Sequence, residues 1–382
     1  MHILHVVGAR PNFMKVAPVM DALANRGGVR QTLVHTGQHY DANMSEVFFE
    51  QLGIPVPDVN LDVGSGSHAV QTAQIMIRSE EVLLRQKPDL VLVYGDVNST
   101  VASALVCAKL QIPVGHVEAG LRSFDRTMPE EINRLLTDQV VDLLFTPSED
   151  GDANLIREGV SADKIFLVGN VMIDTLARLI GKARDRWPVV ADELGLPLGA
   201  TTSQDYVLVT LHRPSNVDDQ ASLKRIILAL EGISERAQVV FPLHPRTRER
   251  IGEMGAASGR DALCLLDPIS YLDFVALQSR ATAVITDSGG VQEETTYLGV
   301  PCLTVRENTE RPITVSLGTN TLVGQDMELL TSEVNRALDG EGKRGGIPPL
   351  WDGLSAGRIA DVIIGGAAPS RGTAASPPVG TQ

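Results

Sequence analysis

The chain has 382 residues, of which 43% are hydrophobic and 21% charged, and its formal net charge is -14. A chain of this length usually forms more than one hydrophobic core, so we expect two domains. The acidic balance disfavours nucleic acid and anionic membranes as partners, because both carry negative charge. The sequence contains neither the roughly 18 consecutive apolar residues of a membrane helix nor a signal-peptide pattern at its start.

In chain order, the first half alternates short apolar runs with longer amphipathic stretches. We expect helices over 69–86 and 99–110. The expected buried strands span 3–7, 32–35, 90–94, 114–117, 143–146 and 165–168. This alternation predicts a doubly wound parallel sheet.

The pattern pauses over 187–204, a stretch rich in Pro, Gly, Ala, Ser and Thr, where we expect only a short helix near 191–194. Strands are then expected over 206–210, 239–242, 263–266, 283–286 and 302–305. The prediction is therefore an α/β protein with two Rossmann-like domains facing a central cleft, with the ligand at the C-terminal ends of the strands. The expected parts are a first domain over 1–170, a connection over 171–205, a second domain over 206–352, a C-terminal helix over 353–365 that packs back on the first domain, and a disordered tail over 366–382.

Two motifs that follow predicted strands have the composition of anion sites. In the first, Ser288, Gly289 and Gly290 open a helix, where small residues and free N–H groups suit phosphate, and Glu294 can accept hydrogen bonds from a ribose diol. In the second, over 8–15, two cations bracket another helix start. An ordinary strand–helix turn is the alternative interpretation of each.

Several carboxylates lie just after predicted strands or at a predicted helix start. Asp96 and Glu118 each follow a buried strand, and Glu130 and Glu131 begin a predicted helix, where compensation of the helix dipole explains one of the two. Several carboxylates at one site suit proton transfer. His212 also follows a strand, as a sugar or phosphate contact would.

Cofactor motifs are not indicated. No set of His, Asp and Glu residues has convincing metal-ligand spacing, and the full dinucleotide fingerprint does not occur. The three cysteines, Cys107, Cys264 and Cys302, are an odd number and lie far apart, which is typical of a cytoplasmic protein without disulfides.

Together these motifs resemble the non-hydrolysing UDP-N-acetylglucosamine 2-epimerase family over nearly the whole chain. The matching segments are 8–11 with Lys15, 36–39, 95–96, 115–122, 129–134, 169–174, 212–213, 287–294 and 309–312. The resemblance implies a GT-B-like fold, usually a homodimer, and reversible conversion of UDP-N-acetylglucosamine to UDP-N-acetylmannosamine without metal or cofactor. In that family the C2 proton is removed as UDP leaves C1, giving 2-acetamidoglucal. UDP then adds back, and a proton reaches the opposite face of C2.

Carried over position by position, the resemblance implies catalytic roles for Asp96, Glu118, Glu130, His212 and Lys15. It implies substrate contacts for Arg10, Lys15, Asp96, Glu118, His212, Phe274, Ser288, Gly289, Gly290, Glu294 and Arg311. Gln38, Arg213 and His244 match a second site where some members bind UDP-N-acetylglucosamine as an activator. Asp41, where a Gln is common, and the lack of an Arg over 66–68 depart from that site.

Four alternatives stay open. The opening Gly-Ala-Arg-Pro-Asn is similar to that of relatives acting on a UDP-2,3-diacetamido-uronate. The others are a GT-B glycosyltransferase, a hydrolysing epimerase that releases free sugar and UDP, and a non-catalytic UDP-sugar sensor. Asp96, Glu118 and Glu130 together favour an epimerase, since a sensor needs no proton-transfer groups.

Overall fold

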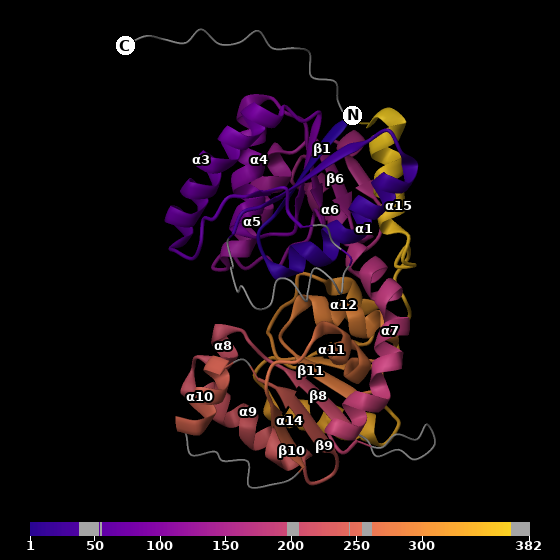
Figure 1. Cartoon of the computed structure of the whole chain (residues 1–382). Helices are drawn as coiled ribbons and strands as arrows, with labels where there is room; N and C mark the ends of the chain where they lie inside the picture. The colour runs from indigo at the N-terminus through magenta and orange to yellow at the C-terminus, as the bar shows by residue number, and fades with distance from the viewer. Residues whose placement is uncertain (38–52, 54–55, 197–205, 244, 254–261, 368–382) are drawn as a thin grey trace. The chain divides into compact units, whose positions relative to one another are not determined.

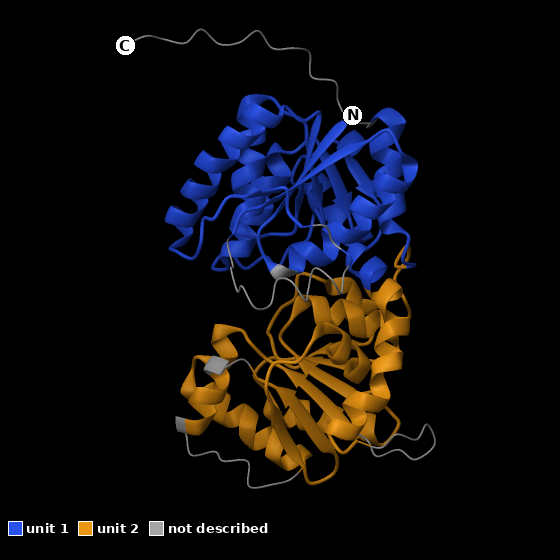
Figure 2. Ribbon diagram, in the orientation of Figure 1, with its two compact units in different colours: residues 1–175, 352–382 blue, residues 176–351 orange. Residues whose placement is uncertain are grey.

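A computed structural model describes residues 1–37, 53, 56–196, 206–243, 245–253 and 262–367. The chain divides into unit 1, residues 1–175 and 352–382, and unit 2, residues 176–351 (Figure 2). Each unit is a parallel sheet flanked by helices (Figure 1). The predicted α/β class with two Rossmann-like domains is confirmed.

Among the described residues, the sheet of unit 1 has the strand order β3-β2-β1-β4-β5-β6-β7, and every pair is parallel. Its strands are β1 (His2–Val7), β2 (Arg30–His35), β3 (Val59–Asn60), β4 (Leu90–Tyr94), β5 (Val114–Val117), β6 (Leu143–Thr146) and β7 (Ile165–Leu167). Its helices are α1 (Arg10–Arg26), α3 (His68–Gln86), α4 (Asn98–Leu110), α5 (Pro129–Val140), α6 (Glu149–Arg157) and α15 (Ser355–Val362). All residues of the central strands β4 and β5 are buried because helices cover both faces of the sheet.

The described part of unit 2 has the order β10-β9-β8-β11-β12-β13, again all parallel. Its strands are β8 (Tyr206–Thr210), β9 (Gln238–Pro242), β10 (Leu263–Leu266), β11 (Ala283–Thr286), β12 (Cys302–Thr304) and β13 (Asn320–Leu322). Its helices are α8 (Pro214–Val217), α9 (Gln220–Ile233), α10 (Pro245–Glu253), α11 (Tyr271–Gln278), α12 (Gly289–Leu298), α13 (Pro312–Ser316) and α14 (Met327–Leu338).

In both sheets the strand order reverses beside the first strand of the unit. The reversal lies between β1 and β4 in unit 1 and between β8 and β11 in unit 2. Loops after these strands diverge to opposite faces of the sheet, which leaves room for a ligand at the strand ends. Of the segments that the sequence marks as functional, 8–15, 95–96, 212–213 and 287–294 follow these four strands.

Within the expected connection over 171–205, the structure has a longer helix than the short one expected near 191–194. Val171–Glu193 is one helix, α7, which starts in unit 1 and continues into unit 2. Its last turns bury Trp187, Val190 and Ala191 in the core of unit 2, and Trp187 stacks on Tyr206 with ring centroids 6.1 Å apart. This helical spacing of buried residues keeps the segment helical although Pro188 lies inside it.

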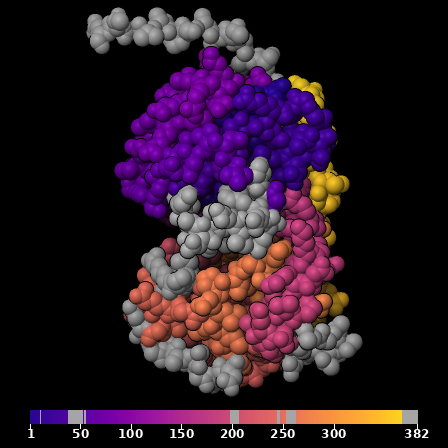
Figure 3. Space-filling view, in the orientation of Figure 1, coloured from indigo at the N-terminus to yellow at the C-terminus, as the bar shows by residue number. Residues whose placement is uncertain are grey.

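The C-terminal segment belongs to unit 1. Helix α15 packs against α1, and the C-terminal residues, yellow in Figure 3, border the indigo N-terminal ones. The Asp174 carboxylate accepts the N–H groups of Ser355 at 3.1 Å and Ala356 at 2.7 Å, which satisfies the start of α15. Arg26 of α1 donates to Asp361 at 2.6 Å. None of the described helices combines the length and the apolar character that crossing a bilayer requires.

Candidate active site

The ends of β1, β4 and β5 bring a buried ion pair together in unit 1. Lys15 is in the second turn of α1, the helix that follows β1, and its Nζ donates to the Glu118 carboxylate just past β5. Gly95 follows β4 with φ +64°, and a Cβ there would lie 2.9 Å from Lys15 Nζ. Glycine at this position therefore leaves room for the ion pair.

Glu118 itself has a left-handed backbone, with φ 77°. Such a conformation costs a non-glycine residue about 1–2 kcal/mol. The N–H groups of Glu118 and Ala119 both donate to the Phe145 carbonyl, at 3.1 and 3.0 Å, and hold the turn in place. Backbone strain maintained in this way is a feature of functional sites.

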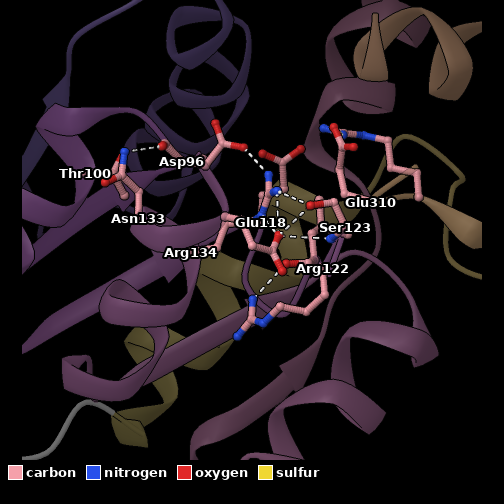
Figure 4. Close-up of polar contacts among 12 residues, drawn as sticks. Asp96, Thr100, Glu118, Arg122, Ser123, Asn133, Arg134 and Glu310 are labelled. Atoms are coloured by element: carbon pink, nitrogen blue, oxygen red, sulfur yellow. Dashed lines mark hydrogen bonds and ion pairs between the residues drawn. The ribbon is translucent and has the colours of Figure 1, made fainter. Parts of the chain in front are cut away.

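Asp96 is held by a second group of charges. Arg134 on α5 donates through Nη1 to Asp96 Oδ2 at 2.5 Å, and through Nη2 to Glu131 at 2.8 Å (Figure 4). Glu131 also accepts the backbone N–H groups of Ser123 at 2.9 Å and Phe124 at 3.0 Å. Burial raises the pKa of Glu131, but these N–H groups and Arg134 outweigh it and hold that pKa below its ordinary value.

Helix α5 has an unusual distribution of side chains. It buries Glu131, Arg134 and Asp138, whereas Ile132 and Leu136 are exposed. Glu130 is half-buried in the first turn, and no other described residue pairs with its carboxylate. Of the two adjacent acids, Glu131 is thus the structural one and Glu130 is left for other contacts.

A third charged cluster contacts the turn that follows β4. His116 on β5 places Nδ1 2.6 Å from Asp138 and Nε2 2.7 Å from the Gly95 carbonyl oxygen. Arg122 lies 2.8 Å from the same Asp138 carboxylate and also pairs with Glu158 at 2.7 Å. Burial raises the pKa of Asp138, but His116 and Arg122 together hold it below its ordinary value.

In unit 2, the buried Asp287 joins the ends of β8 and β11. It accepts the backbone N–H groups of His212 at 3.1 Å and Arg213 at 2.9 Å, and the amide of Asn216 at 2.9 Å. The His212 ring places Nδ1 3.1 Å from Asp287, and the side chain is 58% exposed. A carboxylate at this position favours the tautomer protonated on Nδ1, which leaves Nε2 as an acceptor.

The start of α12 has the features of an anion site. Its N-cap, Ser288, makes no side-chain cap hydrogen bond. The Arg311 guanidinium packs so closely over Gly289 that a Cβ there would lie 2.7 Å from Arg311 Cζ. Arg311 is held by Glu293 and Glu310, each at 2.6 Å. A helix start with a fixed cation beside it suits a pyrophosphate.

An aromatic pair adjoins the acidic residue of the same motif. The Tyr271 hydroxyl on α11 donates to Glu294 Oε1 at 2.7 Å, and Phe274 is one turn later on that helix. Phe274 is half-buried against the core of unit 2. The sequence analysis missed Tyr271, although two aromatic residues three positions apart on a short helix were a readable signal.

The structure therefore brings Lys15 and Glu118 together in unit 1, with Asp96 next to Gly95. In unit 2 it brings Arg311 to Gly289 and joins His212 and Arg213 through Asp287. Gln38, Asp41 and His244 lie outside the described residues, and so does the side chain of Arg10. Arg134, His116 and Asp138 enter the site only through their contacts in the structure.

These two Rossmann-like units, with clustered carboxylates in one and an anion-type helix start in the other, have the features of a nucleotide-sugar protein. A family model described as UDP-N-acetylglucosamine 2-epimerase matches residues 21–364. The chain belongs to this family.

Several relatives are similar over most of their length. A UDP-N-acetylglucosamine 2-epimerase homolog of Methanococcus maripaludis is 45% identical, with 88% of this chain and 92% of the relative covered. The UDP-2,3-diacetamido-2,3-dideoxy-D-glucuronate 2-epimerase of Pseudomonas aeruginosa is 44% identical, with the same coverage of 88% and 92%. The crystal structure of Methanocaldococcus jannaschii UDP-GlcNAc 2-epimerase with UDP-GlcNAc and UDP has 42% identity, a TM-score of 0.86 and coverage of 96% of this chain and 100% of that one.

Proposed function

We propose that the protein is a non-hydrolysing epimerase that interconverts UDP-N-acetylglucosamine and UDP-N-acetylmannosamine. The observation that carries the proposal is the group of Lys15, Asp96 and Glu118 at the ends of β1, β4 and β5, with strained backbone at Glu118. An acid/base reaction on two faces of a carbon requires at least two proton-transfer groups at one site. Family membership selects C2 of a UDP-linked 2-acetamido sugar as that carbon.

The proposed reaction has two balanced steps. A base removes the C2 proton, the C1–C2 double bond forms, and the C1–oxygen bond breaks so that UDP leaves with its electron pair. In the second step a UDP oxygen adds to C1, and a proton arrives at C2 from the opposite face. We assign the proton transfers to Asp96, Glu118 and Glu130, with Lys15 stabilising the Glu118 carboxylate.

The groups of unit 2 are assigned to UDP. The start of α12, from Ser288 to Gly290, and the Arg311 guanidinium suit the pyrophosphate, whose negative charge grows as it leaves C1. Glu294 suits the ribose diol, with Tyr271 and Phe274 beside it. His212, oriented by Asp287, suits a polar contact to the sugar nucleotide.

Proton NMR of the purified protein with UDP-N-acetylglucosamine in D2O tests the reaction. We expect a second UDP-linked sugar with deuterium at C2 in both epimers. Release of free sugar and UDP would instead place the protein among hydrolysing epimerases. No reaction, with or without excess UDP-N-acetylglucosamine as an activator, would contradict this substrate.

A second candidate substrate is a UDP-2,3-diacetamido-uronate. It is favoured by the 44% identity between this chain and the Pseudomonas aeruginosa enzyme. This value is close to the 45% identity between this chain and the UDP-N-acetylglucosamine 2-epimerase homolog of Methanococcus maripaludis. The same NMR experiment with this sugar nucleotide separates the two candidates, because the elimination at C1 and C2 is common to both.

We also propose that the protein is a cytoplasmic homodimer. The three cysteines are free thiols, as expected in a reducing compartment. Val70, Ile77 and Leu84 form an exposed stripe on α3, since residues seven apart share one helix face. These three exposed side chains make an apolar surface suited to a second copy of the chain.

A further inference from the structure

His116 is buried between two hydrogen-bond acceptors. Its Nδ1 lies 2.6 Å from a carboxylate oxygen of Asp138, and its Nε2 lies 2.7 Å from the Gly95 carbonyl oxygen. A carbonyl oxygen can only accept, so Nε2 must carry a proton. The proton in the other contact belongs either to His116 or to Asp138.

The surroundings of Asp138 decide between these two states. Its second oxygen, Oδ2, accepts the backbone N–H of Gly120 at 3.1 Å and lies 2.8 Å from the Arg122 guanidinium. Both contacts favour the ionised carboxylate. With Asp138 ionised, Nδ1 of His116 is also a donor, and the ring is a buried imidazolium. Arg122 and Glu158 complete a cluster of two cations and two anions.

The imidazolium acts on the turn that carries Asp96. Its Nε2–H fixes the carbonyl of Gly95, whose N–H donates to Val117 at 3.1 Å. Gly95 adopts φ +64°, and a Cβ at this residue would meet both Lys15 and Glu118. The peptide that His116 holds thus adjoins Asp96 directly and lies against the Lys15–Glu118 pair.

We propose that His116 is a positioning residue that Asp138 keeps as an imidazolium, and that it fixes the Gly95–Asp96 peptide so that the acid/base groups keep their orientation. This inference rests on the proposed epimerase function for its kinetic consequence. The His116 and Asp138 side chains have no exposure to solvent. A charged donor makes a stronger hydrogen bond to the Gly95 carbonyl than a neutral one, so the charge on His116 holds this carbonyl more firmly.

Nitrogen-15 NMR of the histidine rings in the whole protein tests the charge state without any substrate. His116 is assigned by comparison with the His116→Gln variant. We expect both ring nitrogens of His116 to carry protons, because each of them faces an acceptor, the Asp138 carboxylate and the Gly95 carbonyl. A ring with one unprotonated nitrogen would overturn the proposal.

Kinetics of the variants test the positioning. We expect His116→Leu to lower kcat by about tenfold or more, and Asp138→Asn by less, with KM and UDP affinity within about twofold of wild type. His116→Gln should recover part of the loss, because its amide can still donate to the Gly95 carbonyl. Wild-type kcat in both His116→Leu and Asp138→Asn would overturn the positioning role.

The matched control is Glu158→Gln, which breaks the ion pair with Arg122 but leaves both contacts of His116 in place. It should lower the free energy of unfolding and leave kcat unchanged. An equal fall of kcat in Glu158→Gln and Asp138→Asn would show that the cluster only stabilises the fold. Failure of wild type to epimerise any UDP-sugar would refute the proposed function, whereas the NMR measurement still decides the charge of His116.

Discussion

Arg134 and Asp96, 38 residues apart in the chain, form an ion pair in which Arg134 Nη1 lies 2.5 Å from Asp96 Oδ2. The Arg134 side chain is buried and shares its guanidinium with Glu131, so the start of α5 is tied to the end of β4. This shared cation holds one predicted catalytic carboxylate on a rigid part of the fold.

Replacement of Arg134 by Met should affect both stability and turnover. It leaves the buried Glu131 without its cation, and breaking a buried pair from one side costs about 3 kcal/mol or more. We expect urea unfolding to show this loss and kcat to fall by about tenfold, because Asp96 loses its partner. Arg336→Met removes an exposed pair with Glu333 and should change neither quantity. Unchanged kcat in Arg134→Met would contradict the role assigned to the pair.

Removal of each acid/base carboxylate should lower turnover and spare nucleotide binding. We expect Asp96→Asn, Glu118→Gln and Glu130→Gln each to lower kcat by about 10²-fold or more, which is typical of lost general acid/base catalysis. UDP affinity by calorimetry should persist, because the proposed UDP groups are in unit 2. Glu328→Gln, at an exposed residue of α14, serves as a surface control. Near wild-type rates in all three variants would remove the basis of the site assignment.

Addition of one methyl group at Gly289 should weaken UDP binding. A Cβ there would lie 2.7 Å from Arg311 Cζ, so the guanidinium must move away from the start of α12. We expect Gly289→Ala to weaken UDP affinity by about tenfold or more, as loss of a charge-assisted contact does. In Gly232→Ala, a Cβ on helix α9 meets nothing within 4 Å. That control should keep UDP affinity and raise stability by about 0.5–1 kcal/mol. Equal UDP affinity in the two variants would contradict the assignment.

His5 should make the fold sensitive to mild acid. Burial lowers the pKa of His5 from 6.5 to about 4, against the opposing hydrogen bond with Gln31. The folded protein therefore keeps His5 neutral, and its contribution to stability is present above about pH 6.5 and is lost as the pH falls toward 4. Between about pH 7 and 4, we expect the free energy of unfolding of wild type to fall by about 3 kcal/mol more than that of His5→Gln. Parallel pH curves for the two proteins would show that His5 does not contribute.

Charges placed on the exposed stripe of α3 should prevent dimer formation. We expect wild type to run as a dimer in light scattering after size exclusion, and Ile77→Glu with Leu84→Glu to give a monomer. Leu228→Glu is the matched control, because Leu228 is an exposed leucine on α9 in unit 2. A monomeric wild type, or a dimer that persists in the double variant, would contradict the assigned surface.

The strand pattern of the fold could be predicted from the sequence because most strands are short apolar runs between polar turns. The predicted 90–94 and 206–210 coincide with β4 and β8. The missed strands, β3 and β13, lie at sheet edges and have two and three residues, too few for a readable pattern. The end of α7 was misread because Pro188 and the small residues after it outweighed the buried spacing of Trp187 and Val190.

The site could be predicted only where a residue directly follows a strand, as Asp96 and Glu118 do. The partners of these residues depend on tertiary contacts across 38 residues for Arg134 and Asp96 and across 22 for His116 and Asp138. Helix α5 adds a misleading signal, because its exposed Ile132 and Leu136 would normally be assigned to the core.

The path of the chain sets an order of completion during synthesis. Unit 1 is completed by α15, which follows unit 2 in the chain, whereas unit 2 is the continuous segment 176–351. Residues 176–351 are therefore all synthesised before α15, and the face of α1 that receives α15 stays bare until that helix has emerged. The N-terminal unit is begun first and finished last, so a released chain that ended at residue 351 would hold every segment of unit 2 but lack the helix that covers α1.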